Sequence, residues 1–93
     1  MTELSVEERL EIIAELEKAL GDDAITLGEM VQAIRKRLYG MTQLQYATFI
    51  GISDRTLREI EKGTTDARLS IMNKVLAPGG FQLSARRRKP PKL

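Results

Sequence analysis

The pattern of apolar and polar residues predicts five short helices, most of them ended by glycine. The first helix is expected over residues 5–20, where apolar residues lie three or four positions apart. These residues are Val6, Leu10, Ile13, Leu16 (or Glu17) and Leu20. Ser5 and Glu8 have the spacing of a capping box, in which each side chain accepts a hydrogen bond from the other residue's backbone N–H. Gly21 is expected to end the helix in the left-handed conformation.

Two more helices are expected before residue 51. The second covers residues 27–38. Its apolar stripe consists of Leu27, Met30, Val31 and Ile34. The third begins at Thr42, which has the capping-box spacing with Gln45. Gly51 is expected to end this helix with a positive φ, a conformation that costs other residues energy.

The fourth helix is expected to run from Ser53, its N-cap, to about residue 61. Leu57 and Ile60 are its two strong core anchors, and Gly63 follows its end. Asp66 is expected to cap the fifth helix, which residues 78–80 (Pro-Gly-Gly) end. The inward residues of the fifth helix are expected to be Leu69, Met72, Val75 and Leu76.

The period of the pattern changes after residue 80. Phe81, Leu83 and Ala85 alternate with Gln82 and Ser84, which is typical of a β-strand. A single strand has no partner in an otherwise helical chain, so we expect it to pair with the same strand of a second copy. The expected organisation is therefore an acidic helical extension over residues 1–26, a helical domain over 27–80, and a dimerisation strand with a basic tail over 81–93.

The composition excludes several classes of site. The chain has no Cys and no His, which removes disulfides, thiolate metal sites and the commonest general base. No glycine-rich nucleotide-binding motif occurs, and we expect no enzymatic activity, no cofactor and no metal. The longest apolar run is far shorter than the roughly 20 residues that cross a membrane. Because the N-terminus is acidic, unlike a signal peptide, a cytoplasmic protein is expected.

The net charge of +2 conceals a strong asymmetry along the chain. Residues 1–29 contain two basic residues and nine carboxylates, a net charge of −7. Residues 30–93 contain thirteen basic residues and four carboxylates, a net charge of +9. The basic part is typical of a protein that binds a polyanion, with an ordinary solvated surface as the alternative.

The third and fourth helices, joined by residues 51–53, have the spacing of a helix-turn-helix. When Leu57 and Ile60 face inward, the polar side chains of the fourth helix remain outside. They are Asp54, Arg55, Thr56, Arg58, Glu59 and Lys62. This helix would be about 13 Å long, and the major groove of B-DNA is about 12 Å wide. The exposed face is therefore suited to read base edges, although an ordinary surface helix is the alternative.

Several motifs together resemble the Cro/cI (Xre-type) family of DNA-binding domains over residues 27–83. They are Arg35, Gly40-Met41-Thr42-Gln43, Tyr46-Ala47, Ile50-Gly51-Ile52-Ser53 and Ile60-Glu61-Lys62-Gly63. The resemblance implies an all-α, five-helix, lambda-repressor-like helix-turn-helix domain, here with an extra N-terminal helix and a short C-terminal β-strand. The segment before Gly40 is one residue longer than the family pattern.

The resemblance also implies roles for single residues. Gln43 is expected to contact a DNA phosphate, and Arg35 is expected to form a structural ion pair with Glu61. Base readout is expected from Asp54, Arg55, Thr56 and Glu59. Further phosphate contacts are expected from Thr42, Ser53, Arg58, Lys62 and Thr64. The expected dimer strand contributes Phe81, Leu83 and Ala85.

Leu44 and Phe49 depart from the family pattern, because they lie where it usually has exposed polar residues. We therefore expect the N-terminal helix, a second subunit or a partner protein to cover them.

A Cro-type domain followed directly by a short strand resembles HipB-type antitoxins. This resemblance implies a homodimer that binds a double-stranded DNA operator, represses its own operon, and has a HipA-like Ser/Thr kinase toxin as partner. The acidic N-terminal helix is not a usual part of that pattern. The alternatives are a stand-alone or phage-like repressor of the same family with no toxin, and a protein adaptor that uses the helix-turn-helix as a scaffold.

Overall fold

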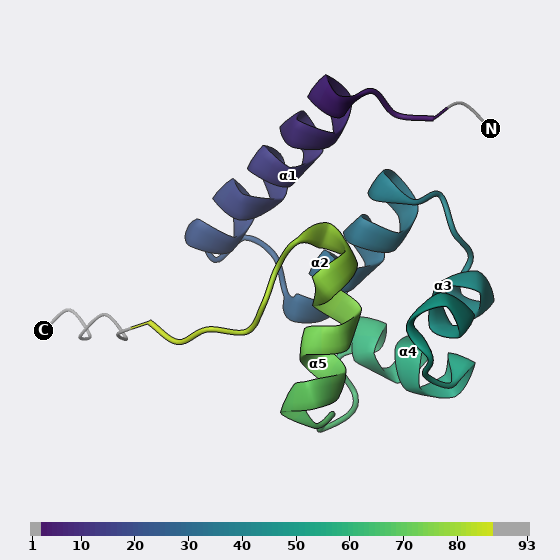
Figure 1. The fold of residues 1–93 in the computed structure, drawn as a ribbon. Coiled ribbons are helices and arrows are strands. Elements are labelled where there is room, and N and C mark those ends of the chain that lie inside the picture. The colour runs from purple at the N-terminus through teal and green to yellow at the C-terminus, as the bar shows by residue number, and fades with distance from the viewer. Residues whose placement is uncertain (1–2, 87–93) are drawn as a thin grey trace, which may run out of the picture.

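The computed structural model describes residues 3–86, and in this part of the chain the regular structure is entirely helical. The five α-helices shown in Figure 1 are α1 (Val6–Gly21), α2 (Leu27–Ala33), α3 (Gln43–Ile50), α4 (Asp54–Lys62) and α5 (Leu69–Leu76). A π-helical segment, Ile34–Leu38, continues α2, and a 3-10 turn, Ala77–Gly79, follows α5. The order and number of the helices predicted from the apolar pattern are confirmed, but the domain after α1, residues 27–80, contains four α-helices and not the five that the family resemblance implies. No helix within the described residues is long and apolar enough to cross a membrane.

Reciprocal caps fix the starts of three helices. The predicted capping boxes at Ser5 and at Thr42 are both present. A third, which the sequence analysis missed, joins Thr26 and Glu29 at the start of α2, with bonds of 3.0 and 3.1 Å. These bonds satisfy backbone N–H groups that the first turn of a helix leaves without a partner.

The prediction for the end of α1 is wrong. Gly21 is the last helical residue and does not take the left-handed conformation, which falls on Asp23 with a φ of 55°. Aspartate tolerates this conformation better than most residues, so the chain can turn two positions later than expected. Gly51 and Gly63, by contrast, do end α3 and α4 with φ of 77° and 74°.

The predictions for the start of α5 are also wrong. Arg68 is the N-cap and no side chain caps the helix, so Asp66 does not have that role. The later start places Leu69 in the first turn, where its side chain is 73% exposed. The helix packs through its second half, where Val75 and Leu76 are buried.

The core lies between α2 and the three helices that follow it. Its fully buried side chains are Met30, Val31, Ile34, Tyr46, Leu57 and Val75. The hydroxyl of Tyr46 donates a hydrogen bond of 2.8 Å to the carbonyl oxygen of Val75 and so joins α3 to α5. This burial raises the pKa of the Tyr46 phenol, which keeps it a neutral donor.

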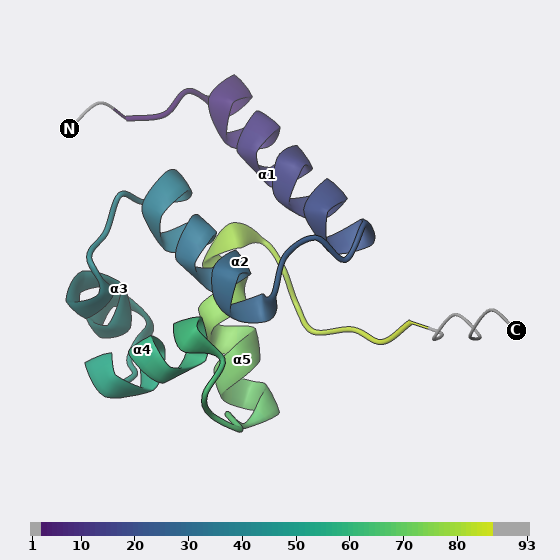
Figure 2. The same ribbon diagram turned by 180° about the vertical axis from the view of Figure 1, so that it is seen from behind.

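Helix α1 lies on the far side of α2 from α3 and α4, as Figures 1 and 2 both show. Leu16 is its one buried residue, and Glu15 forms an ion pair of 2.6 Å with Arg37. Val6 and Leu10, which were predicted to belong to an inward stripe, are 74% and 60% exposed. The reason is that α1 packs mainly against one neighbour, the π-helical segment that continues α2. One neighbour is not enough to bury the whole apolar face of α1.

The segment after residue 80 is extended but is not a strand in the described chain. A strand needs a neighbouring strand for its hydrogen bonds, and the helical chain supplies none. The alternation itself is confirmed at Phe81 and Leu83, which are half-buried against the core, while Gln82 and Ser84 are exposed. Ala85 is exposed, and the predicted basic tail beyond Arg86 lies outside the described residues.

Candidate nucleic-acid interface

The corner between α3 and α4 is tightly fixed. The backbone N–H groups of Gly51 and Ile52 both donate to the carbonyl oxygen of Ala47, at 2.9 and 3.0 Å. The hydroxyl of Ser53 then accepts from the backbone N–H of Thr56 at 3.0 Å and caps α4, as predicted. The corner is therefore held by two bonds between backbone groups and by one bond from a backbone N–H to the Ser53 hydroxyl.

Helix α4 is anchored inward by Leu57 and Ile60, which are 0% and 4% exposed. Its predicted outward residues all lie at least partly in solvent: Asp54, Arg55, Thr56, Arg58, Glu59 and Lys62. The side chain of Arg55 is 85% exposed. The face that the sequence analysis assigned to base readout is thus open in this structure.

The polar residues of this face are linked to one another. Nε of Arg55 lies 3.1 Å from Oε1 of Glu59, and Nη2 of Arg58 lies 3.2 Å from Oδ2 of Asp54. The sequence analysis treated these residues singly and missed both pairs. The signal was present, since oppositely charged residues four positions apart face each other on a helix.

A buried ion pair joins α4 to the π-helical segment. Arg35 donates from Nε and Nη2 to the two carboxylate oxygens of Glu61 at 2.8 and 2.9 Å, and the two side chains are 6% and 4% exposed. Nη1 of Arg35 donates to the carbonyl oxygen of Met41 at 2.9 Å. The structure therefore contains the ion pair that the family resemblance implies.

The extra residue before Gly40 does not disturb this pair. A π-helical turn accommodates one more residue than an α-helical turn, and Ile34–Leu38 is such a segment. We attribute the longer segment to this turn, which contains Arg35 and leaves its guanidinium within reach of Glu61.

Gln43 also contacts Glu61, a feature that the sequence analysis did not predict. Its Nε2 donates to Oε1 of Glu61 at 3.2 Å, which brings the start of α3 against the end of α4. The candidate phosphate-binding residues other than Arg58 therefore lie near the two ends of α4, and Arg58 lies between them. Ser53 lies at its N-terminal end, and Thr42, Gln43, Lys62 and Thr64 lie towards its C-terminal end.

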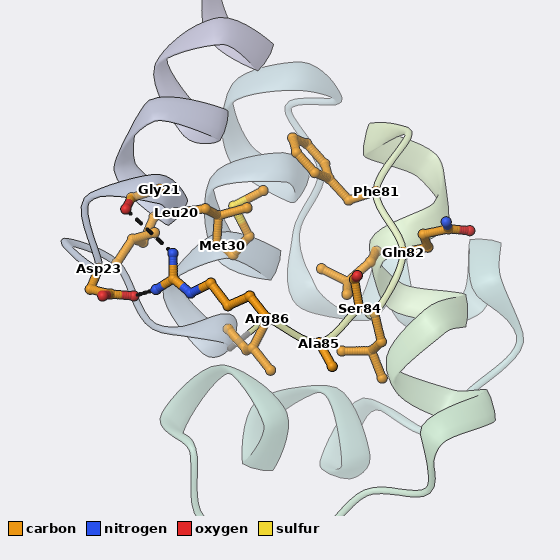
Figure 3. A pocket seen from close by; sticks show the side chains of 13 residues that line it. Leu20, Gly21, Asp23, Met30, Phe81, Gln82, Ser84, Ala85 and Arg86 are labelled. Carbon is orange, nitrogen blue, oxygen red and sulfur yellow. Dashed lines mark hydrogen bonds and ion pairs between the residues drawn. The ribbon is translucent and has the colours of Figure 1, made fainter. Parts of the chain in front are cut away.

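The candidate dimer residues lie elsewhere, at a groove of about 440 Å³ between the end of α1, the start of α2 and the segment after residue 80. Figure 3 shows Phe81 turned towards α2 and Arg86 reaching the end of α1. Arg86 forms an ion pair with Asp23 and donates to the carbonyl oxygen of Gly21. The groove is mainly apolar, and no residue of α4 lines it.

No group of His, Cys, Asp and Glu side chains suited to a metal ion occurs within residues 3–86. The arrangement of the outward face of α4 instead suits hydrogen bonding to a polar, elongated surface such as the edge of a base-pair stack.

Comparison with known proteins supports this assignment. A family model described as helix-turn-helix matches residues 31–79, which is more than half of the chain. The match includes α3, α4, the corner between them and both members of the buried ion pair. Searches of curated proteins and of solved structures gave no significant match. The chain therefore belongs to the Cro/cI-type helix-turn-helix family of DNA-binding transcription regulators.

Proposed function

We propose that the protein is a sequence-specific repressor that inserts α4 into the major groove of its operator. The observation that supports this most directly is the open face of α4, with Leu57 and Ile60 buried beneath it and Arg55 85% exposed. An arginine can donate two hydrogen bonds to O6 and N7 of guanine, and a glutamate can accept from N4 of cytosine. We assign base readout to Asp54, Arg55, Thr56 and Glu59.

Phosphate contacts are assigned to the two ends of this face and to Arg58 between them. Ser53 and Thr42 lie at helix starts, where backbone N–H groups favour an anion. Gln43, Arg58, Lys62 and Thr64 complete the set. Such contacts fix the orientation of the protein on the duplex without reading its sequence.

Replacing Arg55 with Ala tests the readout. We expect operator binding to weaken by about 1–3 kcal/mol and preference at one base pair of each half-site to relax, because a bidentate contact to one base is lost. Binding is measured by fluorescence anisotropy on the operator and on single-base variants, after the operator has been selected from genomic fragments.

Gln43→Ala is the matched control for this experiment. It is expected to weaken binding to all sequences by a similar factor, since a phosphate contact carries no sequence information. An Arg55→Ala protein that loses affinity equally on every sequence would instead place Arg55 on a phosphate. Affinity that does not change with salt concentration would contradict DNA binding altogether and favour a protein adaptor.

We further propose that the protein acts as a homodimer through the segment containing Phe81, Leu83 and Ala85. The exposed edge of this segment, at Gln82 and Ser84, is compatible with pairing to a second copy. Leu44 and Phe49 are 63% and 56% exposed, so α1 does not cover them. A second subunit or a partner protein remains as the cover for these two side chains.

A HipB-like antitoxin role is the finer proposal, with a stand-alone or phage-like repressor as the alternative. The exposed Leu44 and Phe49 favour a protein partner, although a second subunit would serve as well. Co-expression with the products of adjacent genes and purification through a tag on this chain separates the two. Recovery of a kinase-sized partner supports the antitoxin, and recovery of this chain alone supports the stand-alone repressor.

A further inference from the structure

Both arginines on the outward face of α4 are already paired with a carboxylate one turn away. The pair formed by Asp54 and Arg58 has an ordinary explanation, since an acidic residue four positions before a basic one stabilises a helix. The pair formed by Arg55 and Glu59 has the opposite order, which is the weaker one for helix stability. Both of its members are at least 38% exposed, so solvent also screens it. A contribution to helix stability therefore does not explain why a glutamate occupies position 59.

The two carboxylates weaken the electrostatic attraction between the outward face of α4 and a DNA duplex. Its outward face has three cations, Arg55, Arg58 and Lys62, and two carboxylates, Asp54 and Glu59. A phosphate that approaches Arg55 must also approach the carboxylate of Glu59, 3.1 Å from Nε of that arginine. The attraction of this face for DNA of any sequence is thereby reduced, and such sequence-independent attraction comes mainly from cations near phosphates.

In the major groove, Arg55 and Glu59 can form hydrogen bonds with different bases. Guanine presents only acceptors there, N7 and O6, which suit an arginine. Cytosine presents the N4 amino donor there and no acceptor of its own, which suits a carboxylate. Against guanine, or against O4 of thymine, the carboxylate of Glu59 would face an acceptor, and the two groups would repel each other.

We propose that Glu59 determines specificity by exclusion. Its carboxylate repels phosphates and base acceptors that come close to Arg55, so Arg55 binds favourably only where one half-site offers a guanine to Arg55 and a cytosine amino group to Glu59. This inference rests on the proposed placement of α4 in the major groove and adds to it a G·C requirement and a reason for weak binding to random DNA.

The experiment compares Glu59→Gln with Glu17→Gln, an exposed residue of α1. Both substitutions keep the size of the side chain and raise the net charge by one unit, but only the first changes α4. For Glu59→Gln, we expect affinity for a random-sequence duplex to rise on the order of threefold to tenfold and the log–log salt slope to steepen by about 0.9 per subunit, because Arg55 becomes able to bind a phosphate. For Glu17→Gln, we expect both quantities to stay close to those of the wild type.

Sites selected from a random oligonucleotide pool give the second measurement. The wild type is expected to require cytosine at one position of each half-site, and Glu59→Gln is expected to accept other bases there, because an amide both donates and accepts. Equal effects of the two substitutions on random DNA, or identical selected sites for wild type and Glu59→Gln, would overturn the inference while leaving DNA binding intact. If the wild type selects no sequence at all, the proposed function itself fails.

Discussion

Gly28 permits a close approach between α2 and α4. It lies in the first turn of α2 and is buried against the end of α4. A Cβ atom at this position would lie 2.6 Å from the carbonyl oxygen of Ile60 and closer still to that of Glu61. These are backbone atoms that cannot rotate away, so any side chain here would push α2 and α4 apart.

Gly28→Ala is therefore expected to destabilise the protein by about 1–3 kcal/mol, the usual range for overpacking a core. The free energy of unfolding in urea measures the change. Gly21→Ala is the control, because a Cβ there meets nothing within 4 Å and the residue is helical. We expect Gly21→Ala to be neutral or slightly stabilising, and a similar loss in both variants would refute the steric argument.

The roles of some residues could be predicted from the sequence, and those of others could not. Arg35 and Glu61 could be named as a pair because they belong to motifs of the family, and Leu57 and Ile60 because their spacing marks one face of a helix. The role of Gly28 could not be predicted, because a close approach between two helices depends on how they cross. The contact between Gln43 and Glu61 was missed for the same reason, as it joins residues 18 positions apart in the chain.

At the scale of the elements, the caps determine where helices begin. The carboxylates of Glu8 and Glu29 accept backbone N–H groups of Ser5 and Thr26, and these bonds lower the pKa of both carboxyl groups. A group whose pKa is lower in the folded protein stabilises the fold above its ordinary pKa, near 4.5, and loses this effect as the pH falls through the folded value.

Replacing Glu29 with Gln tests the contribution of the carboxylate charge to stability while keeping the capping hydrogen bonds. Glutamine forms the same capping box in this chain at Gln45, so the variant should fold, but it lacks the carboxylate that favours the positive end of the helix dipole. We expect the wild type to be more stable than Glu29→Gln at pH 7 and this difference to shrink towards pH 3. Urea midpoints at the two pH values measure it, and a constant difference would contradict the linkage.

The number, order and type of helices were predictable because each has a periodic apolar stripe and a glycine or proline near its end. The residues at which each helix begins and ends were less predictable. The start of α5 was placed too early because Asp66 looked like a cap, and Val6 and Leu10 were assigned to the core although α1 has no neighbour there. Periodicity indicates which face of a helix is apolar, but not whether another element covers it.

At the scale of the whole molecule, the acidic helix α1 and the candidate DNA-binding helix α4 lie apart. The acidic α1 lies on one side of α2 and α4 lies on the other, as Figures 1 and 2 show. This arrangement keeps most of the carboxylates away from a duplex bound at α4. It also leaves the segment after residue 80 beside α1, at the groove shown in Figure 3.

Deletion of residues 81–93 is expected to make the protein monomeric, because it removes the proposed pairing segment. Size-exclusion chromatography with light scattering measures the mass. Deletion of residues 87–93 alone is the control and should leave the dimer intact, since Phe81, Leu83 and Ala85 remain. A dimer that survives the longer deletion would show that subunits associate through another surface.

The carboxylate of Glu61 binds Arg35 in the interior and Gln43 near the surface. One side chain therefore supports both the folded state and the position of the Gln43 amide, for which we propose a contact with a DNA phosphate. Variants of Glu61 will lose thermal resistance and operator affinity together, and their binding defects are no guide to base recognition. Genetic screens for altered operator choice should accordingly discount this position, however strong its phenotype.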